Sequence, residues 1–232
     1  MKKIALLFCI LAVITSTSCE EDELKVPVKV NIAFDMNTFE MEDEDKGDPV
    51  LTIDEGYLVI NTIEIDGDRV EGEDYSFTSY YDPSLLVELH EELASQDVIF
   101  EFPQGIYKNI EFSLIIGDDE YPALRLRGIC NKAPLENIPL LFEYPFTEKL
   151  QVEATDSEGS KEIVLTKEEA STATIILDTP NLCKLFNWGM IKQAELTAIE
   201  DEDVLLINNE TNINIFNILA IRLEQSMQVV FE

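Results

Sequence analysis

The chain has 232 residues, of which 16 are basic and 47 are acidic, and its formal net charge at neutral pH is −31. Such a charge excludes nucleic acid and anionic lipid head groups as partners, because phosphate binding requires clustered lysine and arginine. Hydrophobic residues make up 46% of the chain, which is enough for a sizeable core and excludes a disordered acidic tail.

The first 18 residues have the layout of a secretory signal peptide. Lys2 and Lys3 give a positive start, and the apolar run 4–14 follows them. This run is 11 residues long, whereas a membrane-spanning helix needs about 20. We therefore expect residues 1–18 to be a cleaved signal rather than a membrane anchor.

The small residues 16–18 stand directly before Cys19, and the acidic run 20–23 follows it. This arrangement resembles a bacterial lipoprotein signal, in which the cysteine is lipidated and becomes the mature N-terminus, although Ser16 stands where the family usually has Leu, Val or Ile. Several acyl chains on Cys19 would hold a water-soluble body at a membrane, because stable anchoring takes more than one signal. The alternative is a plain signal peptide without lipid.

The acidic residues after Cys19 also resemble the export signal of surface lipoproteins in the Bacteroidota. That resemblance implies a lipid-anchored outer-membrane protein exposed on the cell surface, with residues 19–25 as its acidic tether. The alternative is that this run is only a solvated tether. Without residues 1–18 the chain keeps 14 basic and 47 acidic residues, a formal charge of −33, which favours solubility.

The body predicted for residues 26–178 consists of short segments that alternate apolar and polar side chains. This alternation is typical of half-buried β-strands, and the spacing of about 8–12 residues is typical of an all-β fold. The predicted strands span residues 26–34, 50–54, 57–65, 75–81, 98–102, 110–116, 123–128, 137–144, 148–154, 161–165 and 172–178.

Two breaks are predicted between these strands, at residues 54–56 and at residues 66–68. The second, Asp-Gly-Asp, has the composition of a turn, because glycine accepts positive φ and aspartate bonds to its own backbone. Residues 82–89 leave two alternatives. Asp82 could cap a helix with Pro83 at its first position, or residues 85–89 could form a short strand, which the neighbouring strands favour.

The C-terminal segment, residues 179–232, has a different pattern. Residues 180–196 are predicted to be helical, and residues 212–225 place apolar side chains at three- and four-residue steps. Short strands are predicted at 203–208 and 227–231. The segment is too short to bury a core of its own, so we expect it to pack on the body.

Several segments resemble a group of uncharacterised Bacteroidota lipoproteins that carry a domain of unknown function. The most telling is 102–107, Phe-Pro-Gln-Gly-Ile-Tyr, which leads into the strand 110–116; the others are 63–65, 204–208, 212–216 and 229–231. The resemblance implies a mainly β fold, an antiparallel β-sandwich of the prealbumin or carbohydrate-binding-like type with a short α-containing C-terminal segment. It supplies no active site.

No motif in the sequence predicts catalysis. His90 is the one histidine, and it lacks the partner that a His-Glu-x-x-His zinc site would provide. No Gly-x-Ser-x-Gly elbow and no glycine-rich phosphate loop occurs. We therefore expect a protein that is not an enzyme. The alternative is a glycan hydrolase that uses paired carboxylates.

Carboxylate clusters are the densest chemistry in the chain. Calcium takes six to eight oxygen ligands, which acidic loops can supply, although none of these matches the EF-hand loop. A calcium-stabilised adhesion module is therefore one alternative, and solvated loops that keep sheet edges apart are the other. No other cofactor is expected. The candidate ligands are Asp43, Asp45, Asp66, Asp68, Asp118 and Asp119.

Two cysteines remain besides Cys19 once the signal is removed, Cys130 and Cys183. In an oxidising compartment they could form a disulfide, and closing a loop of 54 residues would stabilise the fold by roughly 4 kcal/mol. The alternative is two buried thiols. Two cysteines alone cannot make a structural zinc site, which takes four ligands.

Aromatic residues and arginines supply the remaining candidates. Trp188 could stack on a sugar ring, or it could fill the core between the C-terminal segment and the body. Arg125 and Arg127 share one face of a predicted strand and are expected to pair with acids across strands. Together these features predict a lipid-anchored, non-catalytic binding or scaffolding protein whose ligand is a glycan or an envelope protein.

Overall fold

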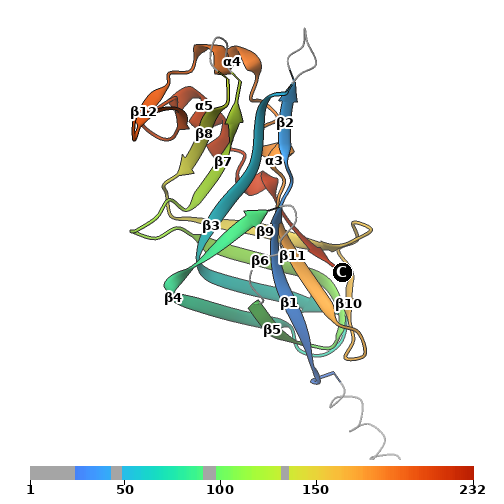
Figure 1. The fold of residues 1–232 in the computed structure, drawn as a ribbon. Helices are drawn as coiled ribbons and strands as arrows, with labels where there is room; N and C mark the ends of the chain where they lie inside the picture. The colour runs from blue at the N-terminus through green and yellow to red at the C-terminus, as the bar shows by residue number, and fades with distance from the viewer. Residues whose placement is uncertain (1–23, 43–48, 91–97, 132–135) are drawn as a thin grey trace, which may run out of the picture.

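The computed structural model describes residues 24–42, 49–90, 98–131 and 136–232 (Figure 1). The predicted signal, Cys19, Asp43 and Asp45 lie outside these ranges. Within them, one mixed sheet of fourteen strands forms the body. The strands are β1 (Pro27–Met36), β2 (Phe39–Glu42), β3 (Pro49–Arg69), β4 (Tyr75–His90), β5 (Val98–Pro103), β6 (Gly105–Ile116), β7 (Leu124–Cys130), β8 (Ile138–Tyr144), β9 (Glu148–Asp156), β10 (Ile163–Leu165), β11 (Ser171–Leu177), β12 (Thr197–Ile199), β13 (Glu202–Ile207) and β14 (Met227–Phe231).

The long strand β3 organises the sheet. On one edge it pairs first with β2 and then with β4, and on the other edge first with β7 and then with β6. From β3 the sheet continues through β7, β8, β13 and β12 in one direction, and through β6, β9, β14, β11, β1 and β5 in the other. The mainly β fold is confirmed. The sheet is mixed because β1·β11, β8·β13 and β9·β14 are parallel pairs.

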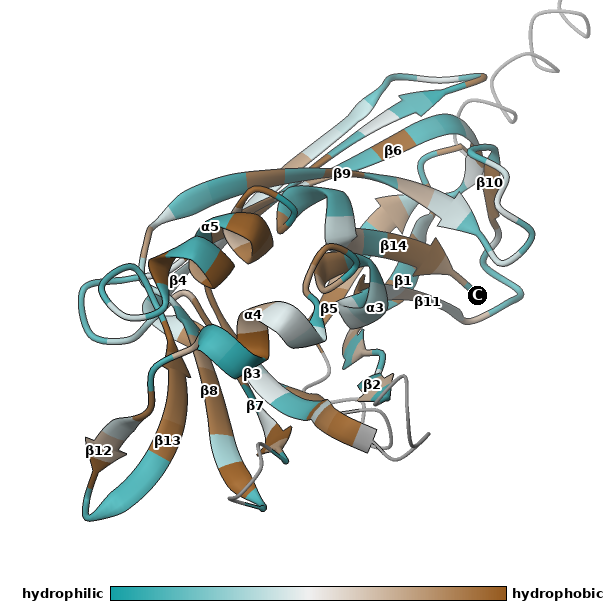
Figure 2. Ribbon diagram, turned by 90° about the horizontal axis from the view of Figure 1, so that it is seen from above, coloured by the Kyte–Doolittle hydropathy of each residue, from teal (hydrophilic) through white to brown (hydrophobic). Residues whose placement is uncertain are grey.

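The core lies inside the curve of this sheet. In β6, the predicted inward set Ile110, Phe112, Leu114 and Ile116 is fully buried, as a period of two requires for a strand with one buried face. The ring of Tyr75 in β4 lies 4.8 Å from that of Phe102 in β5, although β4 pairs with β3 and β5 ends the arm of the sheet that runs from β3 through β6. The two ends of that arm therefore meet across one core. Figure 2 shows the helices on the inner side of the curve.

The predicted breaks within β3 are wrong, because β3 runs without interruption to Arg69. Gly67 belongs to the strand rather than to a turn: a Cβ there would lie 2.8 Å from two ring carbons of Tyr107. Glycine is needed at this position for the close approach of an aromatic ring. The first predicted break, at residues 54–56, is a shift of register between β3 and β7.

The strand alternative for residues 82–89 is confirmed. β4 is one strand from Tyr75 to His90. Its pairing to β3 shifts register between Ile60 and Thr62, so residues 81–84 are an insertion into the ladder. The peptide bond between Asp82 and Pro83 lies within this insertion and is cis.

The C-terminal segment is part of the sheet as well as a cover for it. β14 lies between β9 and β11, and β13 pairs with β8. The two predicted helices are shorter than expected: 180–196 forms α3 (Thr179–Leu182) and α4 (Trp188–Gln193), and 212–225 forms α5 (Ile213–Ala220) and the 3₁₀ helix η1 (Glu224–Ser226). Of the helices in the described ranges, none has the length and apolar character needed to cross a membrane.

Candidate functional site

The two cysteines do not form a disulfide. Cys130 ends β7 and Cys183 follows α3, and both carry buried thiols. Burial raises the pKa of the Cys183 thiol to about 12. Because the thiolate is the reactive form, Cys183 is chemically inert at neutral pH.

The candidate metal ligands that the structure describes, Asp66, Asp68, Asp118 and Asp119, are not brought together in a metal-binding group. Asp66 and Asp68 are exposed near the end of β3, and no group of three or more His, Cys, Asp or Glu side chains in the described ranges could hold a metal ion. The Asp118 carboxylate accepts hydrogen bonds from the backbone N–H groups of Tyr121 (2.9 Å) and Glu120 (2.8 Å), and these bonds lower its pKa. Asp118 therefore orders the turn between β6 and β7.

Trp188 is half-buried at the first position of α4 and packs against the core. The Lys192 ammonium lies 5.3 Å from the centre of its ring. Asn187 caps this helix, and its side-chain oxygen accepts from the backbone N–H of Met190 at 3.2 Å. Trp188 therefore packs between the core and Lys192, and its stacking on a sugar stays a prediction.

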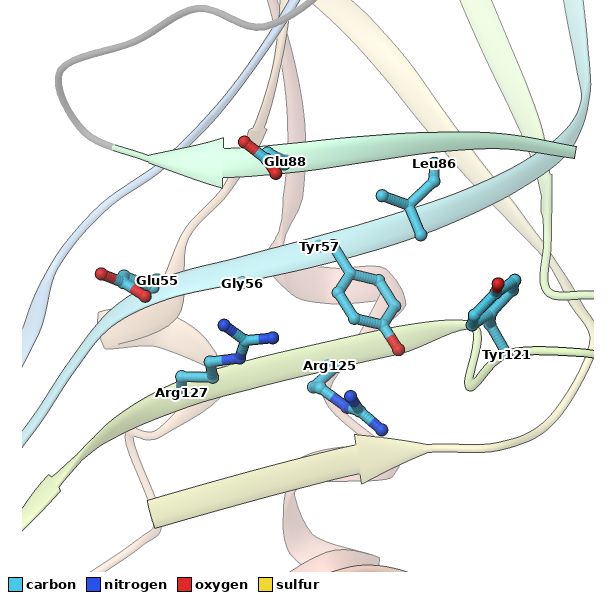
Figure 3. Close-up of a pocket in the computed structure, with 8 residues that line it drawn as sticks. All are labelled: Glu55, Gly56, Tyr57, Leu86, Glu88, Tyr121, Arg125 and Arg127. Atoms are coloured by element: carbon cyan, nitrogen blue, oxygen red, sulfur yellow. The ribbon is translucent and has the colours of Figure 1, made fainter. Parts of the chain in front are cut away.

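A polar basin lies on the solvent-facing side of β3, β4 and β7 (Figure 3). It has a volume of about 250 Å³, and the turn after β6 closes one end of it. Its wall is mainly arginine, glutamate and tyrosine side chains. The lining residues, hereafter the basin, are Glu55, Gly56, Tyr57, Leu86, Glu88, Tyr121, Arg125 and Arg127.

Strand register assembles the basin. Tyr57 in β3 pairs with Arg125 in β7 and with Glu88 in β4, and Glu55 pairs with Arg127. Because side chains directly opposite each other share a face, all five point to the same side of the sheet. Residues from three strands that are distant in the sequence therefore form one surface.

Arg125 is held in place from two sides. Its guanidinium carbon lies 5.4 Å from the centre of the Tyr57 ring, which is within cation–π range. Its Nη2 donates to Oε1 of Glu143 on β8 at 2.5 Å. This ion pair confirms the cross-strand pairing predicted for Arg125. Stacking of the guanidinium over the ring leaves Tyr57 only 8% exposed although it points outward.

Two buried polar atoms in the wall of the basin have no hydrogen-bond partner among the described residues. They are the hydroxyl of Tyr57 and Nε of Arg125. An unsatisfied buried polar group costs about 1–3 kcal/mol, and such groups cluster at functional sites. Burial raises the pKa of Tyr57, with Arg125 opposing the shift. The hydroxyl therefore keeps its proton at neutral pH.

Tyr121 provides an aromatic surface at the end of the basin. Its ring is 51% exposed, and its backbone is held by the hydrogen bond to Asp118 described above. In Figure 3 the Tyr121 ring stands beside that of Tyr57 at the same end of the cavity. A residue interpreted from sequence as a metal ligand thus positions an aromatic ring.

No protein-family model, curated protein sequence or solved structure matches this chain. The basin is therefore interpreted from its own chemistry. Sequence reasoning singled out Arg125 and Arg127 only as partners of acids, and it missed Tyr57 entirely. The signal for Tyr57 is its place opposite Arg125, which only the register between β3 and β7 reveals.

Proposed function

We propose that this protein is a non-catalytic binding protein held by a lipid on Cys19 at the outer face of the bacterial outer membrane, and that the basin is its binding site. The observation that carries the proposal is Tyr57, which lines an open cavity and whose buried hydroxyl has no partner within the described structure. Buried polar groups without a partner are rare in folded proteins, and a ligand group is one means of satisfying this one.

The attachment of the chain near the tether supports this arrangement. The carbonyl oxygen of Leu24 accepts a hydrogen bond from Nη2 of Arg69 at 2.8 Å, so Leu24 is fixed to the body. Leu24 is five residues from Cys19, so it can lie at most about 18 Å from the lipidated cysteine. The start of β1 would therefore face the bilayer. β7 and β8 lie toward the opposite end of the molecule (Figure 1), where the basin would face the medium.

Fractionation and surface proteolysis test the location. Cells that express the full-length protein should retain it in the membrane fraction, and protease added to intact cells should degrade it. Cys19→Ser should move the protein out of the membrane fraction without changing its stability. Equal membrane retention of the Cys19→Ser variant would contradict the anchor, and protection of the wild type from protease would contradict the outward orientation.

Capture from separated envelope fractions tests the binding. Full-length protein in detergent is incubated with the polysaccharide fraction and, separately, with the protein fraction of the envelope. The wild type should retain a component of one fraction that a variant with Tyr121→Ala and Arg127→Met does not retain. Retention of the same material by both proteins would show that the basin is not the binding site.

A further inference from the structure

We infer that the basin binds a neutral pyranose ring of a glycan, through hydroxyl groups that pair with Arg127, Glu55 and Tyr57 and a carbon face that packs on Tyr121. This inference rests on the proposed binding function and adds the chemical class of the ligand. Four properties of the basin carry it: its mixture of donors and acceptors, its balanced charge, its exposed aromatic ring and its volume.

The wall of the basin offers donors and acceptors side by side. Arg127 has only donors and Glu55 only acceptors, and the two stand opposite each other in the ladder between β3 and β7. A sugar hydroxyl can donate and accept at once. Neighbouring hydroxyls on one ring also match the forked geometry of a guanidinium and of a carboxylate. Such a ligand can use both residues together, which a pure donor or a pure acceptor cannot.

The charge of the basin excludes strongly ionic ligands. Its wall contains two arginines and two glutamates, and Arg125 is already paired with Glu143. A phosphate or an acidic sugar would meet the carboxylates of Glu55 and Glu88. A cation would meet the guanidinium of Arg127, since that of Arg125 is neutralised by Glu143. A neutral ligand pays neither repulsion, and the formal charge of the whole chain, −31, further disfavours an anionic polymer.

Apolar surface is present where the carbon face of a ring would lie. The Tyr121 ring is 51% exposed and Leu86 is 38% exposed, and both line the basin. Ligand pockets pair such surfaces with a small number of fixed polar groups. The volume of about 250 Å³ is below the roughly 300–1,000 Å³ typical of pockets for drug-sized ligands. The basin therefore holds one ring, and the rest of a glycan would extend over the sheet.

The buried hydroxyl of Tyr57 makes the site selective. A ligand hydroxyl that reaches it would satisfy a group that is unpartnered within the described residues. A site with such a group rejects analogues that lack the matching hydroxyl, because the protein group then stays unpaired. Removing the Tyr57 hydroxyl should therefore weaken sugar binding while leaving the shape of the basin unchanged.

Affinity electrophoresis tests the inference directly. Full-length protein in a polyoxyethylene detergent, whose head group is not a sugar, is run through native gels that contain mannan, dextran, xylan, galactan or the acidic polymer polygalacturonate. The highly acidic protein migrates readily, so binding appears as slower migration. We expect at least one neutral polymer to slow the wild type and polygalacturonate to leave its migration unchanged.

Matched variants assign the effect to the basin. Tyr121→Ala and Arg127→Met should each weaken retardation at least about tenfold, and Tyr57→Phe should weaken it by about tenfold, as expected for the loss of one hydrogen bond. Tyr80→Ala is the control, because Tyr80 is a 76% exposed tyrosine on β4 outside the basin. Its migration should match that of the wild type. Unfolding midpoints of all variants establish that each is folded.

Three results would overturn the inference. They are the failure of every neutral polymer to slow the wild type, retardation by polygalacturonate alone, and retardation that persists in Tyr121→Ala and Arg127→Met. If a basin-dependent envelope protein is captured while no polymer slows the chain, the inference falls and the proposed binding function stands. If neither fraction nor polymer binds through the basin, both fail.

Discussion

Two arginine–tyrosine pairs lie along β3 and its neighbours, and they are built alike but used differently. Arg69 lies over the ring of Tyr107 at 5.8 Å, and Arg125 lies over the ring of Tyr57 at 5.4 Å. Both tyrosines are at least nine-tenths buried. The environment of the hydroxyl separates the two pairs: that of Tyr107 donates to the Pro103 carbonyl at 2.7 Å, whereas that of Tyr57 has no partner in the described ranges.

The guanidinium groups differ in the same way. Arg69 donates to three backbone carbonyls, those of Gln104 (2.6 Å), Leu24 (2.8 Å) and Glu73 (3.1 Å), and so ties together three chain segments. Arg125 makes one side-chain ion pair, with Glu143. Nε is buried without a partner among the described residues in both arginines, so the number of bonds made by the Nη atoms is what separates them. A buried pair whose groups are mostly satisfied stabilises the fold. A similar pair that leaves a hydroxyl unsatisfied beside solvent is suited to bind a ligand.

Replacing each arginine in turn should give the largest difference between the two pairs in the free energy of unfolding. Arg69→Met leaves three carbonyls without their charged donor, and hydrogen bonds to charged groups contribute about 1.5–3 kcal/mol each without being additive. We expect a loss of about 3 kcal/mol in the free energy of unfolding. Arg125→Met should cost about 1 kcal/mol, because it removes a partly exposed ion pair. Urea denaturation of both variants measures the difference, and equal losses would contradict the division of roles.

A substitution at Gly67 tests how tightly the Arg69–Tyr107 pair is packed. Gly67→Ala places a Cβ at 2.8 Å from the Tyr107 ring, so the ring must shift. We expect a loss of about 2 kcal/mol, as for overpacking of a core. In a Tyr107→Leu background the same substitution should cost much less, because the clashing ring is gone. If Gly67→Ala lowered the free energy of unfolding equally in the Tyr107→Leu background, the clash would not be with the Tyr107 ring.

The hydroxyl groups give a smaller contrast. Tyr107→Phe removes a buried hydrogen bond and leaves the Pro103 carbonyl without it, so we expect a loss of about 1–2 kcal/mol. Tyr57→Phe removes a hydroxyl that has no partner in the described structure. Its free energy of unfolding should stay within about 0.5 kcal/mol of the wild type or rise. Comparable destabilisation by both variants would mean that the Tyr57 hydroxyl is satisfied in solution.

Much of the fold could be predicted because it depends on one buried face. The alternation at residues 110–116 survives in β6, since a period of two is the geometry of a strand on a core. Gly67 could not be interpreted correctly, because Asp-Gly-Asp has the composition of a turn and the Tyr107 ring that requires glycine comes from another strand. The helix predicted at 180–196 is divided into the short helices α3 and α4, since tertiary packing overrides local propensity.

The site was less predictable than the fold for a related reason. Tyr57, Arg125 and Glu88 meet only through the register of three strands, and no local pattern encodes that register. Asp118 was interpreted as a metal ligand because acidic residues cluster around it. Its hydrogen bonds to the backbone are the bonds by which aspartate commonly orders a turn, and the sequence does not distinguish the two uses.

The smallest expected difference between the two pairs is in how the free energy of unfolding falls at alkaline pH. Burial raises the pKa of Tyr107 well above its usual value, with Arg69 opposing the shift, and burial also raises the pKa of Tyr57. A raised pKa in the folded state means that the unfolded chain loses its proton first. Each tyrosine therefore stabilises the fold fully below about pH 10, the pKa of an unfolded tyrosine, and that stabilisation is lost as the pH rises above it.

Tyr107→Phe should therefore flatten the alkaline decline in the free energy of unfolding more than Tyr57→Phe does. Tyr75 and Cys183, whose pKa values burial raises to about 12, add to this decline equally in both variants, so the difference between the variants isolates the two pairs. Urea unfolding at a series of pH values from about 9 upward measures it. A steeper contribution from Tyr57 would mean that its hydroxyl is the more completely enclosed of the two, and would contradict its place in the wall of the basin.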